Sequence, residues 1–365
     1  MKITFNNTIF SNEKTGGISR YFICLIKELI KYKIDIKVLS SINKNKFLKS
    51  LPSKYSSGLY ISNYPLFKFI ESYNLNRFND YIKKQPIDII HDTYYTPGIN
   101  KQKKIKKIIT VHDLIHEKFP NYYRNSKEEI NKKKDSFIGC DHFICVSNNT
   151  KIDLLKYYKI DSSKVSVIHH GANHLEKISY NLNSRIENPY ILYVGKRHKY
   201  KNFIFFLKAY AKSTYINENF ELVCFGGGTF SKNEKKLFNE LKISKKIIYI
   251  NGDDKLLSSY YSFARSLIVP SIYEGFGLPI VEAMNLGCPV FCSNIEVFKE
   301  ICGENAIFFD PVNEDDLIYK LENYLFKDTY LKKCVEEGQI ISKKFSWSAN
   351  SLKTIDVYKK LIATT

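Results

Sequence analysis

The stretch that decides the fold of this chain is Pro270-Ser-Ile-Tyr-Glu-Gly-Phe-Gly-Leu-Pro-Ile-Val-Glu-Ala283. The apolar run Leu267-Ile-Val269 in front of it predicts a buried strand, Pro279 suits the first turn of a helix, and Gly287 gives that helix a stop. The predicted order is therefore strand, glycine-containing loop and helix. At the start of such a helix, free backbone N–H groups and the positive end of the helix dipole favour an anionic phosphate.

Two glutamates flank this loop, and each has a chemical role open to it. Gly275 and Gly277 allow the backbone to approach a ligand closely. We place Glu282 in the first helical turn, where a carboxylate can accept hydrogen bonds from a ribose diol, and Glu274 ahead of the turn, where it can bind sugar hydroxyls. The plain alternative is an ordinary strand-to-helix connection with solvated glutamates.

Strand-like and helix-like segments alternate along the whole chain, which predicts an α/β fold. The pattern weakens in the polar stretch 176–189, where we place the interdomain linker, and a second set of strands follows it. We therefore predict two Rossmann-like, doubly wound domains, residues 1–178 and 179–345, and a C-terminal helix within 346–365. The strand candidates are residues 2–5, 34–39, 87–90, 107–111, 142–146 and 165–168, and then 190–194, 220–225, 247–250, 267–269, 289–292 and 306–309.

The string around Glu274 and Glu282 resembles the donor-site motif of the retaining GT-B glycosyltransferases of family 4, also called glycosyl transferases group 1. Members of that family carry two glutamates eight positions apart around a Gly-Phe-Gly turn. The resemblance implies two Rossmann-like domains facing a cleft, a nucleotide-sugar donor held mainly by the second domain, and no metal or other cofactor. It also implies that the backbone N–H groups around Phe276, Gly277 and Leu278 bind the donor diphosphate.

A basic loop, Val194-Gly-Lys-Arg-His-Lys-Tyr-Lys-Asn202, follows the first strand of the second domain. A planar guanidinium can grip two phosphate oxygens and an ammonium can act as a point charge, so Arg197 and Lys201 are candidates for binding the diphosphate. The family carries an Arg and a Lys in the corresponding loop. Lys196 and Lys199 compete for the first of these positions, and a surface loop without function is the alternative.

In the first domain, the resemblance points to two features at the ends of strands. The pair Gly16-Gly17 resembles the glycine loop that lies against the donor diphosphate, and a plain tight turn is the alternative. His112 follows a strand at the edge where parallel sheets bind ligands, and a strand-end His in this family contacts the transferred sugar. Asp113 is the neighbouring candidate for that contact. Residues 91–97 end the preceding strand and are a hypothesis for the acceptor side.

The segment Val167-Ile-His-His-Gly-Ala-Asn173 departs from the family form, which has an asparagine before the glycine and an aspartate soon after it. We expect the turn at Gly171 to be kept, while the contacts of His170 and Asn173 stay open.

The C-terminal helix holds the only tryptophan, Trp347. In this family the last helix often crosses back onto the first domain, and we expect Trp347 to anchor it there.

Composition restricts the setting in which this chain works. No apolar run approaches the ~20 residues that cross a bilayer, and the start of the chain lacks a signal peptide's apolar region, so we expect a cytoplasmic protein. The eight cysteines form no CxxC pair, which favours buried thiols. Residues 1–180 hold 31 Lys and Arg against 16 Asp and Glu. This basic half, with runs at 101–107 and 132–134, favours an anionic partner such as a membrane surface.

The resulting prediction is a retaining hexosyltransferase of bacterial surface-polysaccharide synthesis, with no nucleic-acid partner. The Tyr-Lys-Asn loop together with the Glu-Gly-Phe-Gly string resembles bacterial mannosyltransferases, which makes GDP-mannose the first candidate donor and a UDP-sugar the second. The expected acceptor is a glycan, lipid-pyrophosphate-linked, at the inner face of the membrane. A basic nucleic-acid-binding protein is the alternative from another class, but it leaves Glu274 and Glu282 without a role. A nicotinamide oxidoreductase would need a fuller glycine fingerprint than residues 225–229 supply.

Overall fold

A computed structural model describes residues 1–63, 67–179, 186, 188–197 and 199–363. The chain forms two compact units. The first unit comprises Met1–Gly171 and Trp347–Thr365, and the second comprises Ala172–Ser346. The polar stretch at 176–189, predicted as the interdomain linker, lies partly outside the described residues. The C-terminal segment therefore belongs to the first unit, although the whole second unit precedes it in the chain.

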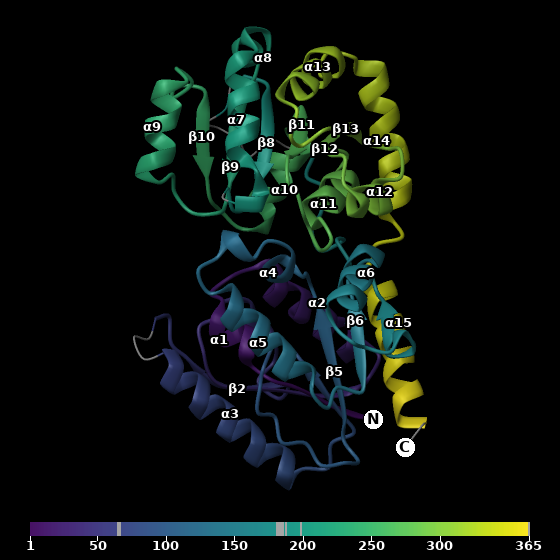
Figure 1. Ribbon diagram of the computed structural model, residues 1–365. Helices are drawn as coiled ribbons and strands as arrows, with labels where there is room; N and C mark the ends of the chain where they lie inside the picture. Colours follow the sequence, from purple (N-terminus) through teal and green to yellow (C-terminus); the bar gives the residue numbers. More distant parts are fainter. Residues whose placement is uncertain (64–66, 180–185, 187, 198, 364–365) are drawn as a thin grey trace. The chain divides into compact units, whose positions relative to one another are not determined.

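The first unit is built on a parallel sheet that has seven strands among the described residues, in the order β3-β2-β1-β4-β5-β6-β7 (Figure 1). The order reverses between β1 and β4, which pair with each other in parallel register. Every residue of β4 is buried, as expected for a strand covered on both faces. The strands are β1 Lys2–Phe5, β2 Asp35–Asn43, β3 Ser56–Tyr60, β4 Ile89–Asp92, β5 Lys106–Val111, β6 His142–Cys145 and β7 Val165–Val167.

The edge strand β3 was not predicted, because the residues Ser-Ser-Gly-Leu-Tyr carry too few apolar side chains to mark a strand. The helices of the first unit are α1 Thr8–Asn12, α2 Gly17–Lys31, α3 Phe67–Lys84, α4 Ile115–Lys118, α5 Ser126–Phe137, α6 Asn148–Tyr157 and α15 Trp347–Ala363.

Helix α15 is tied to the first unit by specific contacts. The hydroxyl of Tyr358 lies 2.6 Å from Nδ1 of His91, and Asn350 Nδ2 donates to the carbonyl of His169 at 2.7 Å. Trp347 is 4% exposed and packs against Tyr21 at a ring-centroid distance of 5.7 Å. These contacts confirm the expectation that Trp347 anchors the last helix on the first domain.

The second unit repeats this topology with a parallel sheet of six strands among the described residues, in the order β10-β9-β8-β11-β12-β13. The order reverses between β8 and β11. The strands are β8 Tyr190–Val194, β9 Glu221–Phe225, β10 Ile247–Ile250, β11 Ser266–Val269, β12 Val290–Ser293 and β13 Ile307–Phe309. The helices are α7 Phe203–Lys212, α8 Thr214–Asn219, α9 Lys232–Glu240, α10 Asp254–Phe263, α11 Leu278–Leu286, α12 Glu296–Cys302, α13 Glu314–Tyr324 and α14 Asp328–Ser342.

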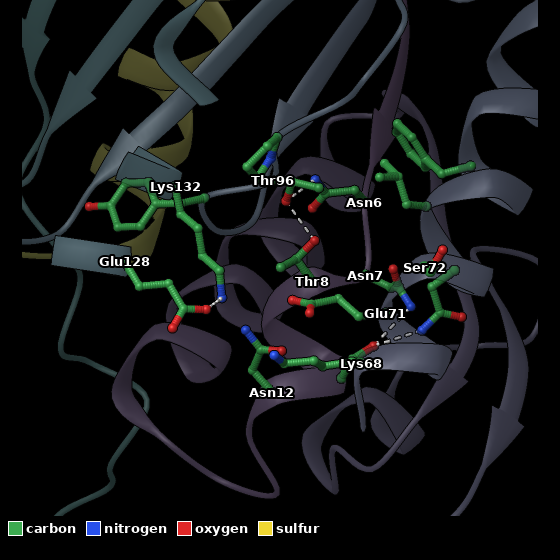
Figure 2. A pocket seen from close by; sticks show the side chains of 16 residues that line it. Asn6, Asn7, Thr8, Asn12, Lys68, Glu71, Ser72, Thr96, Glu128 and Lys132 are labelled. Atoms are coloured by element: carbon green, nitrogen blue, oxygen red, sulfur yellow. Dashed lines mark hydrogen bonds and ion pairs between the residues drawn. The ribbon is translucent and has the colours of Figure 1, made fainter. Parts of the chain in front are cut away.

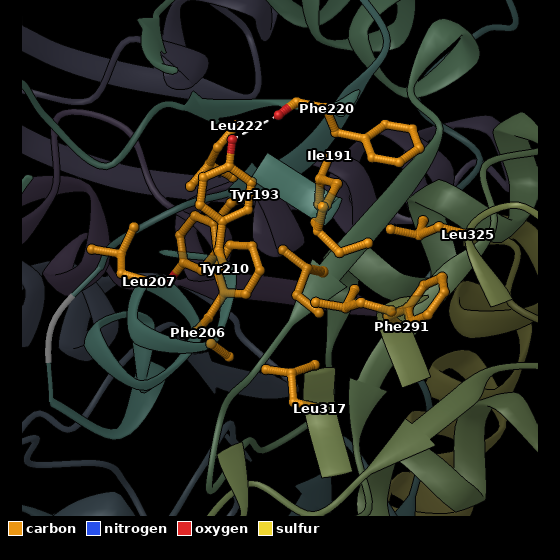
Figure 3. Close-up of a cluster of buried hydrophobic side chains, with 14 of the residues drawn as sticks. Ile191, Tyr193, Phe206, Leu207, Tyr210, Phe220, Leu222, Phe291, Leu317 and Leu325 are labelled. Atoms are coloured by element: carbon orange, nitrogen blue, oxygen red, sulfur yellow. Dashed lines mark hydrogen bonds between the residues drawn. The ribbon is translucent and has the colours of Figure 1, made fainter. Parts of the chain in front are cut away.

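The core of the second unit is aromatic as well as aliphatic (Figure 3). Phe206 and Tyr210 of α7 are fully buried beside strand residues such as Ile191. The hydroxyl of Tyr210 donates to the carbonyl of Phe220 at 2.6 Å, so this buried polar atom has a partner. This packing fixes α7 against the sheet and thereby the loop that leads from β8 into it.

In both units, ligands are expected at the carboxyl edge of the sheet where the strand order reverses. We call this place the switch point, formed by the ends of β1 and β4 in the first unit and of β8 and β11 in the second. The two sequence stretches with the strongest motifs, residues 194–202 and 270–283, follow β8 and β11. The predicted donor loops therefore meet at the switch point of the second sheet.

Candidate active site

The loops after β8 and β11 are hydrogen-bonded to each other. The backbone N–H of Ile272 donates to the carbonyl of Tyr200 at 2.9 Å. The first of these loops ends at Asn202, which adopts a left-handed conformation at φ 55° and donates from Nδ2 to the carbonyl of Pro311 at 2.8 Å. Both loops are thus held at the carboxyl edge of the sheet before any ligand binds.

An ion pair joins the two loops at their centre. Lys201 Nζ lies 2.5 Å from Glu274 Oε1, and the hydroxyl of Ser271 donates to the same oxygen at 2.8 Å. The side chains of Lys201 and Glu274 are 24% and 13% exposed. The structure therefore brings together two residues that the sequence assigned separately to diphosphate and sugar, and it adds Ser271, which sequence reasoning had not singled out.

Glu282 lies deeper in its helix than we predicted. Gly277 adopts φ 107°, a left-handed conformation, and α11 starts at the next residue, Leu278, with Pro279 second. Glu282 is consequently the fifth helical residue, and no acidic residue occupies the first turn. The first-turn placement was wrong because the glycine turn delays the start of the helix.

The carboxylate of Glu282 is buried and already has polar neighbours. Tyr261 donates its hydroxyl to Oε2 at 2.8 Å, and Nε2 of His174 lies 3.3 Å from Oε1. Glu282 is 5% exposed. Sequence reasoning missed both residues: Tyr261 lies on α10 with no motif around it, and His174 directly follows the segment 167–173, which departs from the family form. Beside His174 opens a cavity of about 400 Å³, which Asp254, the first residue of α10, also lines.

Phe276, Gly277 and Leu278 were predicted to bind the diphosphate through their backbone. The side chain of Phe276 is 4% exposed and packs on Phe345 at 5.8 Å, so it is part of the core. A Cβ at Gly277 would lie 2.8 Å from the ring of Phe298. Glycine is thus required at 277 both for its positive φ and for space. Leu278 opens α11, where a helix dipole favours an anion.

Arg197 is engaged elsewhere. Its Nε donates to Glu234 Oε1 at 2.7 Å, and its two terminal nitrogens donate to the carbonyls of Gly226, Gly228 and Thr229 at 2.7 to 3.2 Å. The residue is 7% exposed. These four hydrogen-bond partners are all in residues 226–234, and neither Lys201 nor Glu274 is one of them. The guanidinium of Arg197 instead holds the glycine run 226–228, whose three residues all have positive φ.

In the first unit, Gly16 and Gly17 stand at the start of α2 as predicted. Gly16 precedes the helix, and Gly17 is its first residue. A Cβ at Gly16 would lie 2.2 Å from Oε2 of Glu13, the same oxygen that accepts from the N–H of Ser19 at 3.4 Å. The carboxylate of Glu13 thus occupies the helix start that the resemblance assigns to the diphosphate.

His112 directly follows β5 and is enclosed by aromatic rings. Its ring meets Tyr21 edge-to-face at 5.1 Å and His170 at 5.7 Å. Burial lowers the pKa of His112 to about 3, so the imidazole is neutral near pH 7. Its Nε2 atom is buried and makes no hydrogen bond to the described residues, which leaves a polar group for a ligand.

The alternatives near His112 have structural roles. Asp113 accepts at Oδ1 from the backbone N–H of Ile115 and so supports the start of α4. Gly171 is kept for packing, because a Cβ there would lie 2.4 Å from the backbone nitrogen of Trp347. His170 is buried, and burial holds its pKa well below the ordinary value. Among residues 91–97, the two ring nitrogens of His91 are hydrogen-bonded to the hydroxyls of Tyr358 and Thr110.

The lysine runs are less exposed than their sequence suggests. Lys107 forms an ion pair with Asp92 at 3.3 Å, and Lys133 forms one with Glu117 at 2.9 Å. Both lysines are almost completely buried. Burial raises the pKa of Asp92 to about 6, although Lys107 opposes this shift. These two lysines therefore stabilise the first unit and do not add to a surface patch.

Three absences apply to the described ranges only. Six of the eight cysteines are buried, and no disulfide forms among them. No group of three His, Cys, Asp or Glu side chains within those ranges is arranged to hold a metal ion. None of the helices described there combines the length and hydropathy that crossing a bilayer requires.

Comparison with known families identifies the chain. A sequence family described as Glycosyltransferase Family 4 matches residues 15–174, and one described as Glycosyl transferases group 1 matches residues 176–340. The chain belongs to the family 4 glycosyltransferases. Its similarity to the GT-B fold is equally extensive: the sucrose-phosphate synthase of Thermosynechococcus elongatus superimposes with a TM-score of 0.83 over 100% of both chains at 20% identity.

Two curated relatives of this family 4 glycosyltransferase are mannosyltransferases by name. The O-antigen chain mannosyltransferase RfbU of Salmonella typhimurium is 31% identical over 56% of this chain and 57% of its own length. The O-antigen chain mannosyltransferase B of Escherichia coli is 24% identical and covers 99% of this chain and 100% of its own. The match to RfbU thus spans little more than half of that relative, whereas the match to the Escherichia coli protein runs end to end.

Proposed function

We propose that this protein transfers a hexose from a nucleotide sugar to a glycan, with retention of configuration at the anomeric carbon. The observation that carries the proposal is the ion pair between Lys201 and Glu274 at the switch point of the second sheet, together with the buried carboxylate of Glu282 in α11, the helix that follows the same loop. A cation for phosphate and two carboxylates for hydroxyl groups are the donors and acceptors that a nucleotide sugar requires.

Each of these side chains has one part in the proposed reaction. Glu282, held by Tyr261, accepts hydrogen bonds from the ribose, and Glu274 binds hydroxyls of the transferred sugar. Lys201 and the N–H groups at the start of α11 stabilise the diphosphate as negative charge develops on it, which requires neither a metal nor another cofactor. Neutral His112 orients the reacting sugar ring. We assign no covalent nucleophile, and the leaving phosphate takes the proton of the acceptor hydroxyl.

We propose mannose as the transferred sugar and GDP-mannose as the donor, with a UDP-sugar as the second candidate. The names of the two curated relatives support mannose. Their names also support an acceptor in O-antigen synthesis, which we propose to be a lipid-pyrophosphate-linked glycan bound by the first unit. The cavity beside His174 is our candidate for the nucleobase, since it adjoins the residue that lies against Glu282.

A lipid-linked acceptor calls for contact with a membrane surface, and the first unit has features that support it. Phe69 and Tyr73, four residues apart on α3, are 71% and 43% exposed. Lys68 on the same helix is exposed as well. Basic and aromatic side chains together favour the interface of an anionic bilayer. Cosedimentation with phosphatidylglycerol vesicles, but not with phosphatidylcholine vesicles, is expected, and binding should fall in Phe69→Ser.

The test of the proposed activity is nucleotide release from a panel of donors. The full chain is incubated separately with GDP-mannose, UDP-glucose and UDP-N-acetylglucosamine, and free nucleotide is measured over hours. Release from GDP-mannose above the other donors supports the proposal, and preferential release from a UDP-sugar replaces the donor. Absence of binding and release with every donor, combined with salt-dependent binding of DNA or RNA, would favour the nucleic-acid alternative.

A further inference from the structure

The switch point of the first sheet holds a pocket that the proposed reaction does not use. Asn6 and Asn7 follow β1, and Tyr95, Thr96 and Pro97 follow β4, so the pocket opens where the strand order reverses. Its volume is about 370 Å³, at the small end of the range for small-molecule sites. Helices α1, α3 and α5 supply the remaining walls (Figure 2).

One wall of the pocket is fixed by hydrogen bonds within the protein. Asn6 Nδ2 contacts Asp92 Oδ1 at 2.9 Å and Thr96 Oγ1 at 3.1 Å, and the hydroxyls of Thr8 and Thr96 lie 2.6 Å apart. Asn74 on α3 donates to Ser11 Oγ at 3.1 Å. These bonds connect β1, β4, α1 and α3, so the cavity is preorganised and its polar wall does not have to rearrange to bind.

Other polar groups face the cavity with bonding capacity left. Asn12 Oδ1 is buried and accepts no hydrogen bond from the described residues. Figure 2 shows Asn12, Lys68 and Glu71 converging from one side, while Lys132 and Glu128, 3.4 Å apart, approach from another. The ammonium groups of the two lysines balance the carboxylates of the two glutamates, so the lining carries no net charge. An unpaired buried carbonyl costs about 1–3 kcal/mol, which a ligand hydroxyl would relieve.

The rest of the lining is apolar. Phe78 is 1% exposed and Tyr95 is 7% exposed, and Leu75 and Pro97 complete this part of the surface. A small ligand with one apolar face and several hydroxyls matches this division, because its C–H face can lie on the rings while its hydroxyls meet amides, ammonium groups and carboxylates. A phosphorylated or otherwise polyanionic ligand would gain no net attraction, because Glu71 and Glu128 balance Lys68 and Lys132.

We propose that this pocket binds a neutral sugar residue of the acceptor glycan, and that this sugar is not the one that reacts. The inference rests on the proposed function. The reacting hydroxyl is assigned to the neighbourhood of His112, which follows β5 and does not line the pocket. A sugar held at β1 and β4 would therefore be a more distant residue of the same glycan, and the pocket would select acceptors by the identity of that residue.

The experiment compares a short and a long acceptor in variants that alter only the pocket. Glu71→Gln removes one carboxylate, and Ser72→Trp fills the cavity from an exposed position on α3. Asp80→Asn, an exposed carboxylate on the same helix that does not line the pocket, is the matched control. Steady-state kcat and KM are measured for a lipid-linked monosaccharide and for a lipid-linked trisaccharide, and thermal melts confirm folding.

We expect both pocket variants to raise KM for the trisaccharide by about 5-fold to 20-fold, which corresponds to the loss of one or two hydrogen bonds. Both kcat and the KM for the donor should stay unchanged. For the monosaccharide, both variants should have the kcat and KM of the wild-type protein. Equal effects on both acceptors, or none on either, would overturn the inference.

A second readout does not depend on transfer. Saturation-transfer NMR of the full chain with methyl α-mannoside and methyl α-glucoside should show contact that Ser72→Trp removes and Asp80→Asn keeps. Wild-type protein that releases no nucleotide but still binds a glycoside in the pocket would refute the proposed donor chemistry alone. Active protein that binds no glycoside and shows no acceptor-length effect would refute the pocket alone.

Discussion

The two switch points share a topology and differ in chemistry. At β8 and β11, Lys201 and Glu274 form an ion pair, and the buried Glu282 lies in α11, the helix that follows the same loop. At β1 and β4 the hydrogen-bonded wall consists of amides and hydroxyls, and aromatic rings line another part of the pocket. A parallel sheet determines where a ligand can bind, whereas the residues that end each strand determine which ligand. The point at β8 and β11 suits a nucleotide sugar, whereas the point at β1 and β4, where the charges of two lysines and two glutamates balance, suits an uncharged glycan.

The largest expected effect tests the charged switch point at Glu274. Glu274→Gln removes the carboxylate that pairs with Lys201, so contacts to the transferred sugar weaken in the transition state. We expect kcat to fall by about 10²–10³-fold with donor KM within ~3-fold. The measurement is steady-state kinetics with the best donor, and Glu296→Gln, an exposed carboxylate on α12, is the control. An unchanged kcat would remove Glu274 from the proposed chemistry.

The next prediction tests whether Arg197 binds the donor or stabilises the fold of the second unit. Arg197→Met leaves Glu234 and three carbonyls without their donor, and we expect the free energy of unfolding to fall by about 3 kcal/mol. Lys196→Met, on the exposed neighbour, should change it by less than about 0.5 kcal/mol. Denaturant melts measure both. If Arg197→Met instead kept full stability and raised donor KM, the diphosphate role predicted from sequence would be restored.

A smaller effect is expected at Glu282, because it concerns binding in the ground state. Glu282→Gln retains an acceptor for Tyr261 but weakens the hydrogen bonds to a ribose diol. Donor Kd should rise by about 30-fold, the equivalent of roughly 2 kcal/mol, while kcat at saturation changes little. Isothermal titration with GDP-mannose and with GDP alone provides the comparison. Similar losses for both ligands place Glu282 on the nucleotide, and a loss confined to GDP-mannose would contradict that placement.

The smallest effect distinguishes the units by their response to acid. Burial lowers the pKa of His91 and of His112 to about 3, and it holds the pKa of His170 well below the ordinary value. The unfolded chain therefore binds more protons below pH 6.5, and stability present above that pH is lost as the pH falls. Each histidine contributes about 0.7 kcal/mol between pH 7 and pH 6, roughly 2 kcal/mol together.

The raised pKa of Asp92, about 6, acts in the opposite direction. It stabilises the folded state as the pH falls toward 6 and offsets roughly 0.4 kcal/mol of the loss. Fluorescence of the single tryptophan, Trp347, follows the first unit during thermal unfolding. A melting temperature that stays constant between pH 7 and pH 6 would show that these histidines titrate normally.

Most strands of both sheets could be predicted from the sequence. Runs such as residues 2–5, 190–194 and 247–250 became β1, β8 and β10 with the predicted bounds, because each carries enough apolar side chains to mark a strand. Strand β3 lies at the edge of its sheet and lacks that signal. The glycine at 277 and the stop at Gly287 were also readable, since positive φ leaves few other residues.

The sequence by itself determined the family, the two α/β domains and the residue types at the donor loops, because local periodicity and a long motif encode them. Only the tertiary structure decided which of those residues meet. It pairs Lys201 with Glu274, commits Arg197 to the glycine run, and gives Glu282 the partners Tyr261 and His174. It also reveals the neutral pocket at β1 and β4. Such contacts join segments far apart in the chain, and no local pattern records them.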